Sequence, residues 1–195
     1  MLKNDILRTW RSIPGGRLTK AVRCWRSLGV HAVVVLRFGQ WLLKQNWLVR
    51  FLLSPVYVLQ FHRMRSKWGI EIPRQTEVGE GLYIGHFGGI TISPDARIGK
   101  NVDISQQVTI GVSGHGERRG CPTIGDNVYL APGAKLFGRI TIGNNVAIGA
   151  NAVVHKDIPD NSTVVLAPGF EIISRSVDDP SRRPAIAPDD HSRSR

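Results

Sequence analysis

Apolar residues recur at every sixth position over the middle of this chain, and this period limits the folds that are possible. An α-helix repeats its buried positions about every 3.6 residues, and an alternating strand repeats them every two. A six-residue period suits a short strand followed by a corner, with a branched apolar side chain pointing inward. Three such sides close one coil of roughly 18 residues, and stacked coils bury a continuous apolar column. The repeat positions are Ile72, Val78, Ile84, Ile92, Ile98, Ile104, Ile110, Ile124, Leu130, Leu136, Ile142, Ile148 and Val154.

The repeat is interrupted twice, and each interruption predicts a departure from the regular coil. Ile84 and Ile92 are eight residues apart, so two extra residues bulge around His86. Ile110 and Ile124 are fourteen apart, which we interpret as two regular steps plus two residues, with a loop at 112–123 leaving the coil. A glycine directly follows many repeat positions, where we expect it to supply backbone freedom at the turn. These glycines are Gly79, Gly85, Gly99, Gly111, Gly125, Gly143 and Gly149.

The repeat and the segments around it resemble the hexapeptide-repeat acyltransferases, and within them the serine acetyltransferases and the related polysaccharide O-acetyltransferases. The resemblance covers residues 69–173. It implies a mainly β fold, a left-handed parallel β-helix of hexapeptide repeats, that works as a homotrimer. The segments that carry it run from Glu71 through His86, then Gln107-Val108-Thr109-Ile110-Gly111, Pro122-Thr123-Ile124-Gly125, Gly149-Ala150-Asn151-Ala152-Val153-Val154 and Lys156-Asp157-Ile158-Pro159.

Residues 1–68 differ from the repeat region in charge and composition. They carry thirteen Lys or Arg side chains and one acid, Asp5, whereas the rest of the chain is close to neutral. The net charge of +11 therefore lies in residues 1–68, and we expect any partner that this charge attracts to bind there. All five tryptophans lie in or beside this segment, and it predicts two helical stretches, over His31–Leu43 and Trp47–Phe61, that are broken near Asn46 and bent at Pro55.

Two interpretations of residues 1–68 stay open at this point. The helices could pack against the base of the trimer, as the resemblance to serine acetyltransferases implies. They could also form a basic, Trp-bearing surface that lies on an anionic membrane. Arg37 and Arg50 interrupt the apolar runs, so neither run is long enough for a clean membrane span. No known nucleic-acid-binding module is visible.

Several features bear on the chain's surroundings. The N-terminus does not have the shape of a signal peptide, and the two cysteines do not suggest a disulfide framework. We therefore expect a cytoplasmic protein, peripheral at the inner membrane face if residues 1–68 bind lipid. No metal-ligand spacing is present, so we expect no metal cofactor. The tail at 174–195 is rich in Ser, Arg, Asp and Pro and should be disordered.

His86 is the candidate general base, because the transfer of an acyl group from a thioester to an alcohol needs a group that takes the hydroxyl proton. A neutral imidazole can do this near pH 7. The matching histidine has this role in the family that the chain resembles. Glu71, fifteen residues earlier, is the candidate that orients the imidazole. The family normally has Asp at that place, so Glu is a departure with one extra methylene.

The resemblance also implies acetyl-CoA as the acyl donor, held largely by backbone groups in a groove between neighbouring subunits. The residues that it assigns to this groove are Gly111, Ser113, Gly114, Ala131, Gly149 and Ala150. Small side chains would let a ligand approach the backbone, although they also suit β-helix corners. In the extruded loop, Arg118 and Arg119 could meet a phosphate of CoA or an acidic acceptor, whereas His115 is better explained as solvated.

The acceptor is predicted from two departures. Serine acetyltransferases typically carry Asp directly before the catalytic His and Arg-His before the loop-closing Pro, whereas this chain has Gly85 and Gly120-Cys121. Those polar groups would grip an amino acid, so their loss favours a sugar hydroxyl in exopolysaccharide, capsule or lipid-linked glycan synthesis. One alternative is serine O-acetyltransfer in cysteine biosynthesis. Another is an inert trimeric scaffold, which the presence of His86 and Glu71 speaks against.

Overall fold

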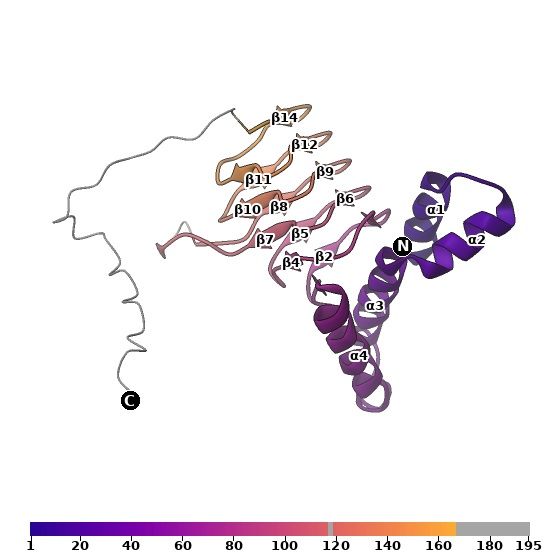
Figure 1. The fold of residues 1–195 in the computed structure, drawn as a ribbon. Coiled ribbons are helices and arrows are strands. Elements are labelled where there is room, and N and C mark those ends of the chain that lie inside the picture. Colours follow the sequence, from indigo (N-terminus) through magenta and orange to yellow (C-terminus); the bar gives the residue numbers. More distant parts are fainter. Residues whose placement is uncertain (117–118, 167–195) are drawn as a thin grey trace, which may run out of the picture.

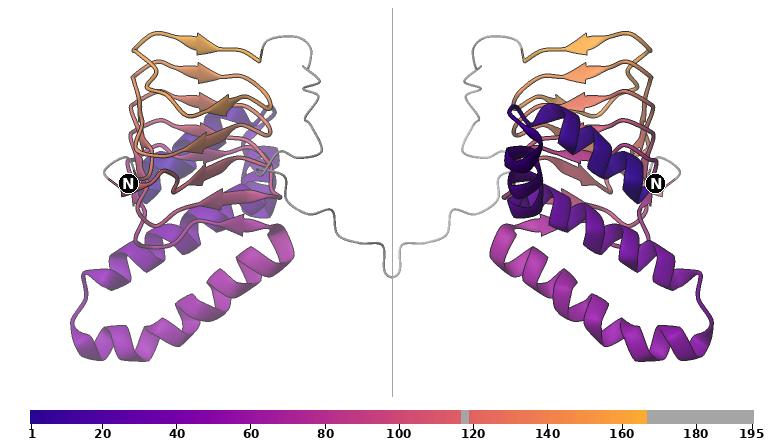
Figure 2. Two further views of the ribbon diagram at one scale, coloured as in Figure 1. Left: turned by 90° about the vertical axis from the view of Figure 1, so that its left-hand side faces the viewer. Right: turned by 90° about the vertical axis from the view of Figure 1, so that its right-hand side faces the viewer.

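The structure is a computed structural model that describes residues 1–116 and 119–166. Four helices precede a three-sided prism of short parallel strands, a left-handed β-helix (Figures 1 and 2). The expected disorder of 174–195 and the last residues of the 69–173 domain lie outside the described part of the chain.

Each side of the prism is a parallel sheet, with strands that come from successive coils. The first sheet has the order β1-β4-β7-β10-β13, the second β11-β8-β5-β2, and the third β14-β12-β9-β6-β3. The strands are β1 (Ile70–Glu71), β2 (Glu77–Val78), β3 (Tyr83–Ile84), β4 (Ile90–Ile92), β5 (Arg97–Ile98), β6 (Asp103–Ile104), β7 (Thr109–Gly111), β8 (Thr123–Ile124), β9 (Tyr129–Leu130), β10 (Lys135–Phe137), β11 (Thr141–Ile142), β12 (Ala147–Ile148), β13 (Val153–Val154) and β14 (Thr163–Val164).

The strand register explains both interruptions of the repeat. A regular coil takes 18 residues, as between Thr123 and Thr141. The coil that contains His86 takes 20, from Ile70 to its partner Ile90, so two residues are inserted there as expected. The coil that contains the loop takes 26, from Arg97 to Thr123. The interval from Ile110 to Ile124 is therefore one regular step plus eight residues, and our interpretation as two steps plus two was wrong.

Most of the glycines after the repeat positions are needed for close packing of the coils, and our expectation that they supply turn freedom was wrong. None of the seven has a positive φ. A Cβ on Gly79 would lie 2.6 Å from the backbone of Gly99 in the next coil, and one on Gly99 would lie 2.5 Å from the carbonyl oxygen of Gly125. Only a residue without a side chain lets the coils stack at this corner.

Asparagines provide the left-handed backbone that the corners require. Asn101, Asn127, Asn145 and Asn161 all have φ between 54° and 57°, a region that Asn tolerates better than most residues. Their side-chain amides also form a ladder that runs up the prism, with bonds of 3.2 Å from Asn101 to Asn127 and from Asn127 to Asn145, and of 3.0 Å from Asn145 to Asn161. One residue type thus shapes the corner and links the coils.

The helical segment consists of α1 (Leu2–Ser12), α2 (Arg17–Arg26), α3 (Leu28–Leu43) and α4 (Trp47–Trp68). The sequence predicted the last two, although α4 runs past Phe61 and includes Pro55 in its interior. Asn46 caps the start of α4 by accepting a hydrogen bond from the Val49 amide at 3.0 Å. Gly69, at φ 60°, ends it.

Helices α1 and α3 close the open base of the β-helix. Asp5 of α1 and Arg37 of α3 form a buried ion pair at 2.8 Å. Asp5 also accepts hydrogen bonds from the amides of Gly81 and Leu82, and Arg37 donates to the carbonyl oxygen of Val78. The exposed end of a sheet leaves such groups unpaired, so the ion pair fastens the helices to the first coil. Among the described helices, none is long and apolar enough to span a membrane.

Candidate active site

His86 lies in the corner between β3 and β4, and its side chain is exposed. The two inserted residues make this corner wider than the others, and Gly88 and Gly89, at φ 99° and 68°, allow the chain to bulge. The carbonyl oxygen of Gly88 accepts a hydrogen bond from the Gln107 amide at 2.8 Å, which fixes the bulge to the coil above. A histidine on a fixed, solvent-facing corner is accessible to a substrate.

Glu71 lies in β1, which pairs with β4 in the same sheet, opposite Thr91. Its side chain is about one-third exposed, and one carboxylate oxygen is 3.5 Å from a guanidinium nitrogen of Arg65, at the end of α4. Among the described residues, Glu71 pairs with Arg65, and no ion pair with His86 forms. Glu71 therefore lies on the strand beside β4, whereas His86 lies in the corner that precedes β4, and the dyad stays a prediction.

The corner that carries His86 continues upward as a column of small residues. The strands before this corner, β3, β6, β9 and β12, are in register, so the positions after them are stacked. Ala131 and Gly149 occupy this place in higher coils, and Ala150 is exposed beside them. A Cβ on Gly149 would lie 2.8 Å from the carbonyl oxygen of Val164, so this glycine is also required by the stacking of coils. Half of the predicted cofactor residues thus share an edge with His86.

The other predicted cofactor residues lie on a different edge, where β7 ends. Gly111 pairs with Phe137, and the ring of Phe137 would be 3.1 Å from a Cβ on Gly111. Ser113 and Gly120 exchange two backbone hydrogen bonds of 3.1 Å, which close the base of the loop. Gly114 follows with φ 94°. These residues are separated from the His86 edge by the face of the first sheet.

The substrate residues that we expected in and near the loop do not form a cluster. Arg118 lies outside the described residues. Arg119 is exposed, and its amide donates to the carbonyl oxygen of Gly116 at 3.1 Å. Cys121 is half-buried and packs against the apolar column. Burial raises the pKa of the Cys121 thiol, and a hydrogen bond with Ser93 partly offsets the rise. Gly85 is exposed next to His86.

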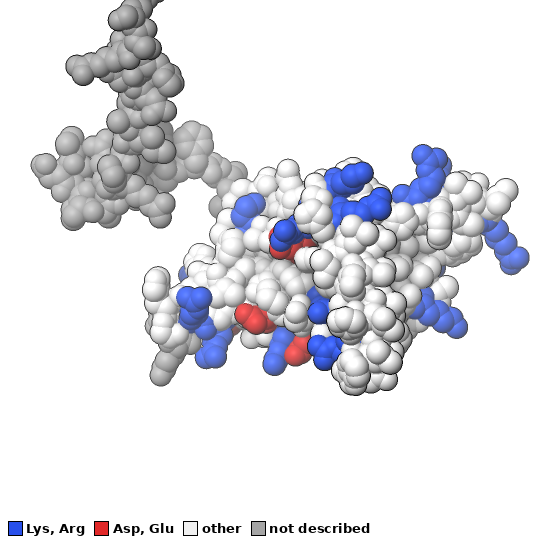
Figure 3. Space-filling view, turned by 90° about the horizontal axis from the view of Figure 1, so that it is seen from below, with Lys and Arg blue, Asp and Glu red and all other residues white. Residues whose placement is uncertain are grey.

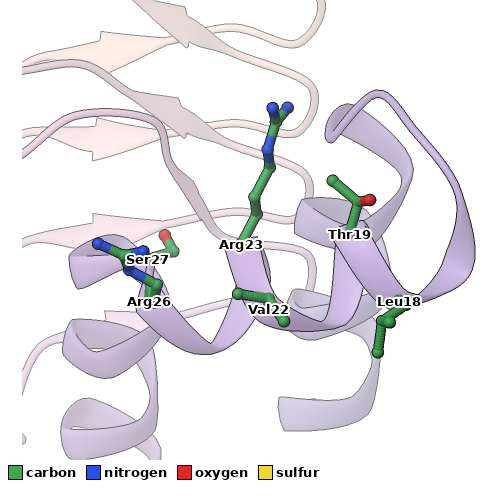
Figure 4. A pocket seen from close by; sticks show the side chains of 6 residues that line it. All are labelled: Leu18, Thr19, Val22, Arg23, Arg26 and Ser27. Atoms are coloured by element: carbon green, nitrogen blue, oxygen red, sulfur yellow. The ribbon is translucent and has the colours of Figure 1, made fainter.

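Two hollows elsewhere on the molecule contain none of the predicted site residues. One, of about 530 Å³, runs along α2 and is lined by Leu18, Thr19, Val22, Arg23, Arg26 and Ser27 (Figure 4). The other, of about 1020 Å³, lies between α3 and the second sheet and is lined in part by Val34, Phe38 and Trp41. In the described part of the chain, no three His, Cys, Asp or Glu side chains are close enough to hold a metal ion.

The fold and the comparisons with known proteins together define the class of protein. Residues 121–156 match the bacterial transferase hexapeptide family (six repeats), so the chain is a hexapeptide-repeat acyltransferase. It is 40% identical over 169 residues to serine acetyltransferase from Staphylococcus xylosus, covering 86% of this chain and 74% of the relative. It is 48% identical over 168 residues to serine acetyltransferase from Staphylococcus aureus strain Mu50, covering 86% and 76%. The chain therefore belongs to the serine acetyltransferase family.

Solved structures agree with this assignment. Serine acetyltransferase isoform 3 from Entamoeba histolytica in complex with cysteine has a TM-score of 0.70 and 28% identity, and the match covers 90% of this chain and 60% of that one. Serine acetyltransferase from Neisseria gonorrhoeae in complex with serine has a TM-score of 0.69 and 27% identity, covering 87% and 67%. This chain thus spans about 60% of the length of the Entamoeba enzyme.

These relatives overturn the expectation of a polysaccharide O-acetyltransferase. That expectation used Gly85 and Cys121 as evidence that amino acid recognition had been lost. The inward packing of Cys121 weakens the argument, because a half-buried side chain that contacts the core reports on packing and not on the acceptor. Gly85 has no side chain, so it gives no positive evidence for a sugar.

Proposed function

We propose that the chain is a serine O-acetyltransferase that transfers the acetyl group of acetyl-CoA to the hydroxyl of L-serine. The observation that carries the proposal is the 48% identity over 168 residues to a serine acetyltransferase, together with an exposed histidine at the widened corner of the β-helix. This was the runner-up among the functions that the sequence suggested.

The proposed mechanism assigns the central proton transfer to His86. The imidazole takes the proton of the serine hydroxyl while the oxygen attacks the acetyl carbonyl carbon. The carbon–sulfur bond then breaks, CoA leaves as the thiolate, and the imidazolium returns the proton to that sulfur. Holding both substrates in one site would supply much of the rate by proximity. Glu71 would act as a positioning residue for the imidazole once it is released from Arg65.

The arrangement of the predicted residues supports a site shared between subunits. A side of the prism is about six residues wide, on the order of 20 Å in extended chain, and it separates the His86 edge from the loop edge. In a homotrimer, each subunit would present its His86 edge to the loop edge of its neighbour. Acetyl-CoA would then lie in the groove between them, against Ala131, Gly149 and Ala150 of one subunit and Gly111, Ser113 and Gly114 of the other.

A thiol-release assay on the purified chain tests the proposal. We expect CoA to be released from acetyl-CoA in the presence of L-serine, and much more slowly with sugars or nucleotide sugars. L-Cysteine, which is bound in the solved Entamoeba structure, should compete with serine. Release of CoA with no amino acid among the accepted substrates would contradict the serine assignment while leaving the acyltransferase class intact.

A further inference from the structure

Helix α4 presents one long face that no described element covers. It forms a hairpin with α3 that extends beyond the base of the β-helix (Figures 1 and 2). Tyr57 and Met64 are its buried residues. The large apolar side chains on its outward face are mostly exposed, with exposed fractions of 77% for Trp47, 73% for Phe51 and 61% for Leu52. The full set is Trp47, Leu48, Phe51, Leu52, Val56, Val58 and Leu59.

The outward face of α4 changes character along its length. Residues three and four apart lie on the same side of a helix, so the exposed apolar residues of 47–59 form one stripe over the first half of α4. The second half continues with exposed bases, at Arg63, Arg65 and Lys67. With 22 residues, α4 is about 33 Å long. It therefore presents an apolar half that points away from the body and a basic half close to it.

The helical segment offers no exposed acid beside these bases. Asp5 is its one acidic residue, and it is buried in the ion pair with Arg37. Figure 3 shows the underside of the molecule, where Lys and Arg side chains, together with some Asp and Glu side chains, lie around a large uncharged surface. The exposed charge of residues 1–68 is thus of one sign, and the partner that complements this segment must be anionic as well as able to accept apolar side chains.

We propose that the outward face of α4 binds an anionic lipid surface. The apolar half would enter the boundary between headgroups and acyl chains, and the basic half would contact the headgroup phosphates and carboxylates. A second copy of the chain is a poorer partner, because two such faces would bring bases together without an acid between them. From the sequence, residues 1–68 as a whole were expected to form the membrane-binding surface. The structure restricts this surface to α4, because α1 and α3 are already packed on the first coil.

Sedimentation of the full chain with lipid vesicles tests the proposal. The probes are vesicles of phosphatidylcholine alone and of phosphatidylcholine with phosphatidylserine. We expect binding to the anionic vesicles at low salt and little binding to the neutral ones.

Two double variants separate the apolar from the basic half of α4. The double variant Trp47→Ser/Phe51→Ser should lower the partition coefficient about tenfold or more, since it removes most of the inserting area. The double variant Arg63→Gln/Lys67→Gln should lower it by a similar factor and reduce its salt dependence. Arg65 is left unchanged, because it pairs with Glu71.

Matched changes on the β-helix control for general effects of charge and hydrophobicity. Lys100→Gln/Lys156→Gln removes two exposed bases from the β-helix. Val165→Ser/Leu166→Ser removes two exposed apolar side chains that follow β14, at the far end of the prism. Both controls should bind vesicles like the unchanged chain. Equal losses in control and α4 variants would overturn the proposal, as would a full chain that stays in the supernatant.

Sedimentation velocity without lipid tests whether a second copy of the chain covers this face instead. If Trp47→Ser/Phe51→Ser loses a higher oligomer but keeps its vesicle binding, the face belongs to a contact between copies and the lipid proposal is wrong.

Discussion

At the scale of single residues, the candidate dyad depends on which partner the Glu71 carboxylate takes. His86 lies in the corner that precedes β4, and Glu71 lies on β1, which pairs with β4. Arg65 holds the carboxylate at 3.5 Å, and both side chains are more than one-third exposed. Such a pair contributes about 0–1 kcal/mol, so substrate binding could easily replace it with an interaction with His86.

Replacing His86 with Ala should remove acetyl transfer and leave CoA binding and assembly nearly unchanged. A lost general base typically lowers kcat by about 10²–10⁴-fold, because the proton must go to water instead. Steady-state kinetics with L-serine, and calorimetry with CoA, measure the two effects. An enzyme that keeps more than half of its kcat would show that another group takes the proton.

Glu71→Gln should cause a smaller loss of activity than His86→Ala and should alter the pH profile of kcat/KM. A carboxylate beside an imidazole stabilises its protonated form, so its removal should shift the acidic limb of the profile, where a general base becomes protonated and inactive, to lower pH. Arg65→Gln is the matched control, and it should leave the profile in place. An identical profile for Glu71→Gln and the unchanged enzyme would remove Glu71 from the dyad.

Ala150→Leu should weaken CoA binding at little cost to folding. Ala150 is exposed on the His86 edge, so a larger side chain there would enter the groove and not the core. Gly149→Leu is a poorer probe, because its Cβ would meet the carbonyl oxygen of Val164 at 2.8 Å and disturb the coil. Calorimetry with CoA and a thermal melt separate the two effects. Unchanged affinity in a well-folded Ala150→Leu variant would place the cofactor elsewhere.

At the scale of elements, the six-residue period was enough to predict the strands, the corners and the bulge at His86. It was not enough for the loop, since fourteen residues can be divided in more than one way and only strand pairing decides between them. The packing role of the glycines also needed the structure, because a contact between coils cannot be inferred from the sequence of one strand.

The sequence did not predict helices α1 and α2. Helix α1 is ordered by its long-range contact with the first coil through Asp5. The edge on which each cofactor residue lies likewise follows from the register.

The asparagine ladder predicts unequal effects for two changes at one position. Asn127→Ala would lose ladder bonds on both sides and would force alanine, which tolerates the left-handed region less well than asparagine, to stay at φ 56°. The left-handed conformation costs about 1–2 kcal/mol in such a residue, and each hydrogen bond contributes about 0.5–1.5 kcal/mol. Asn127→Gly would lose only the bonds. Urea denaturation should therefore show the alanine variant to be the less stable by about 1 kcal/mol or more. Equal stabilities would mean that the backbone conformation carries no strain.

At the scale of the whole molecule, the division of the predicted site between two edges would make the assembly of a trimer a requirement for the proposed chemistry. One chain places His86, Ala131 and Gly149 on one edge and Gly111 and Ser113 on another, with the first sheet between them. An isolated chain would hold acetyl-CoA by only half of these contacts. A closed ring of three subunits would create three complete sites, each from two chains.

Complementation between two inactive variants tests this arrangement. His86→Ala removes the base on one edge, and Ser113→Trp should block the groove on the other, because Ser113 is exposed at the base of the loop. Each variant alone should form inactive trimers. When the two chains are co-expressed and mix randomly, a site has both unaltered halves in roughly one case in four, since the two halves come from different chains. Activity should thus recover to about a quarter of the unchanged enzyme, whereas a site built within one chain would give no recovery at any mixing ratio.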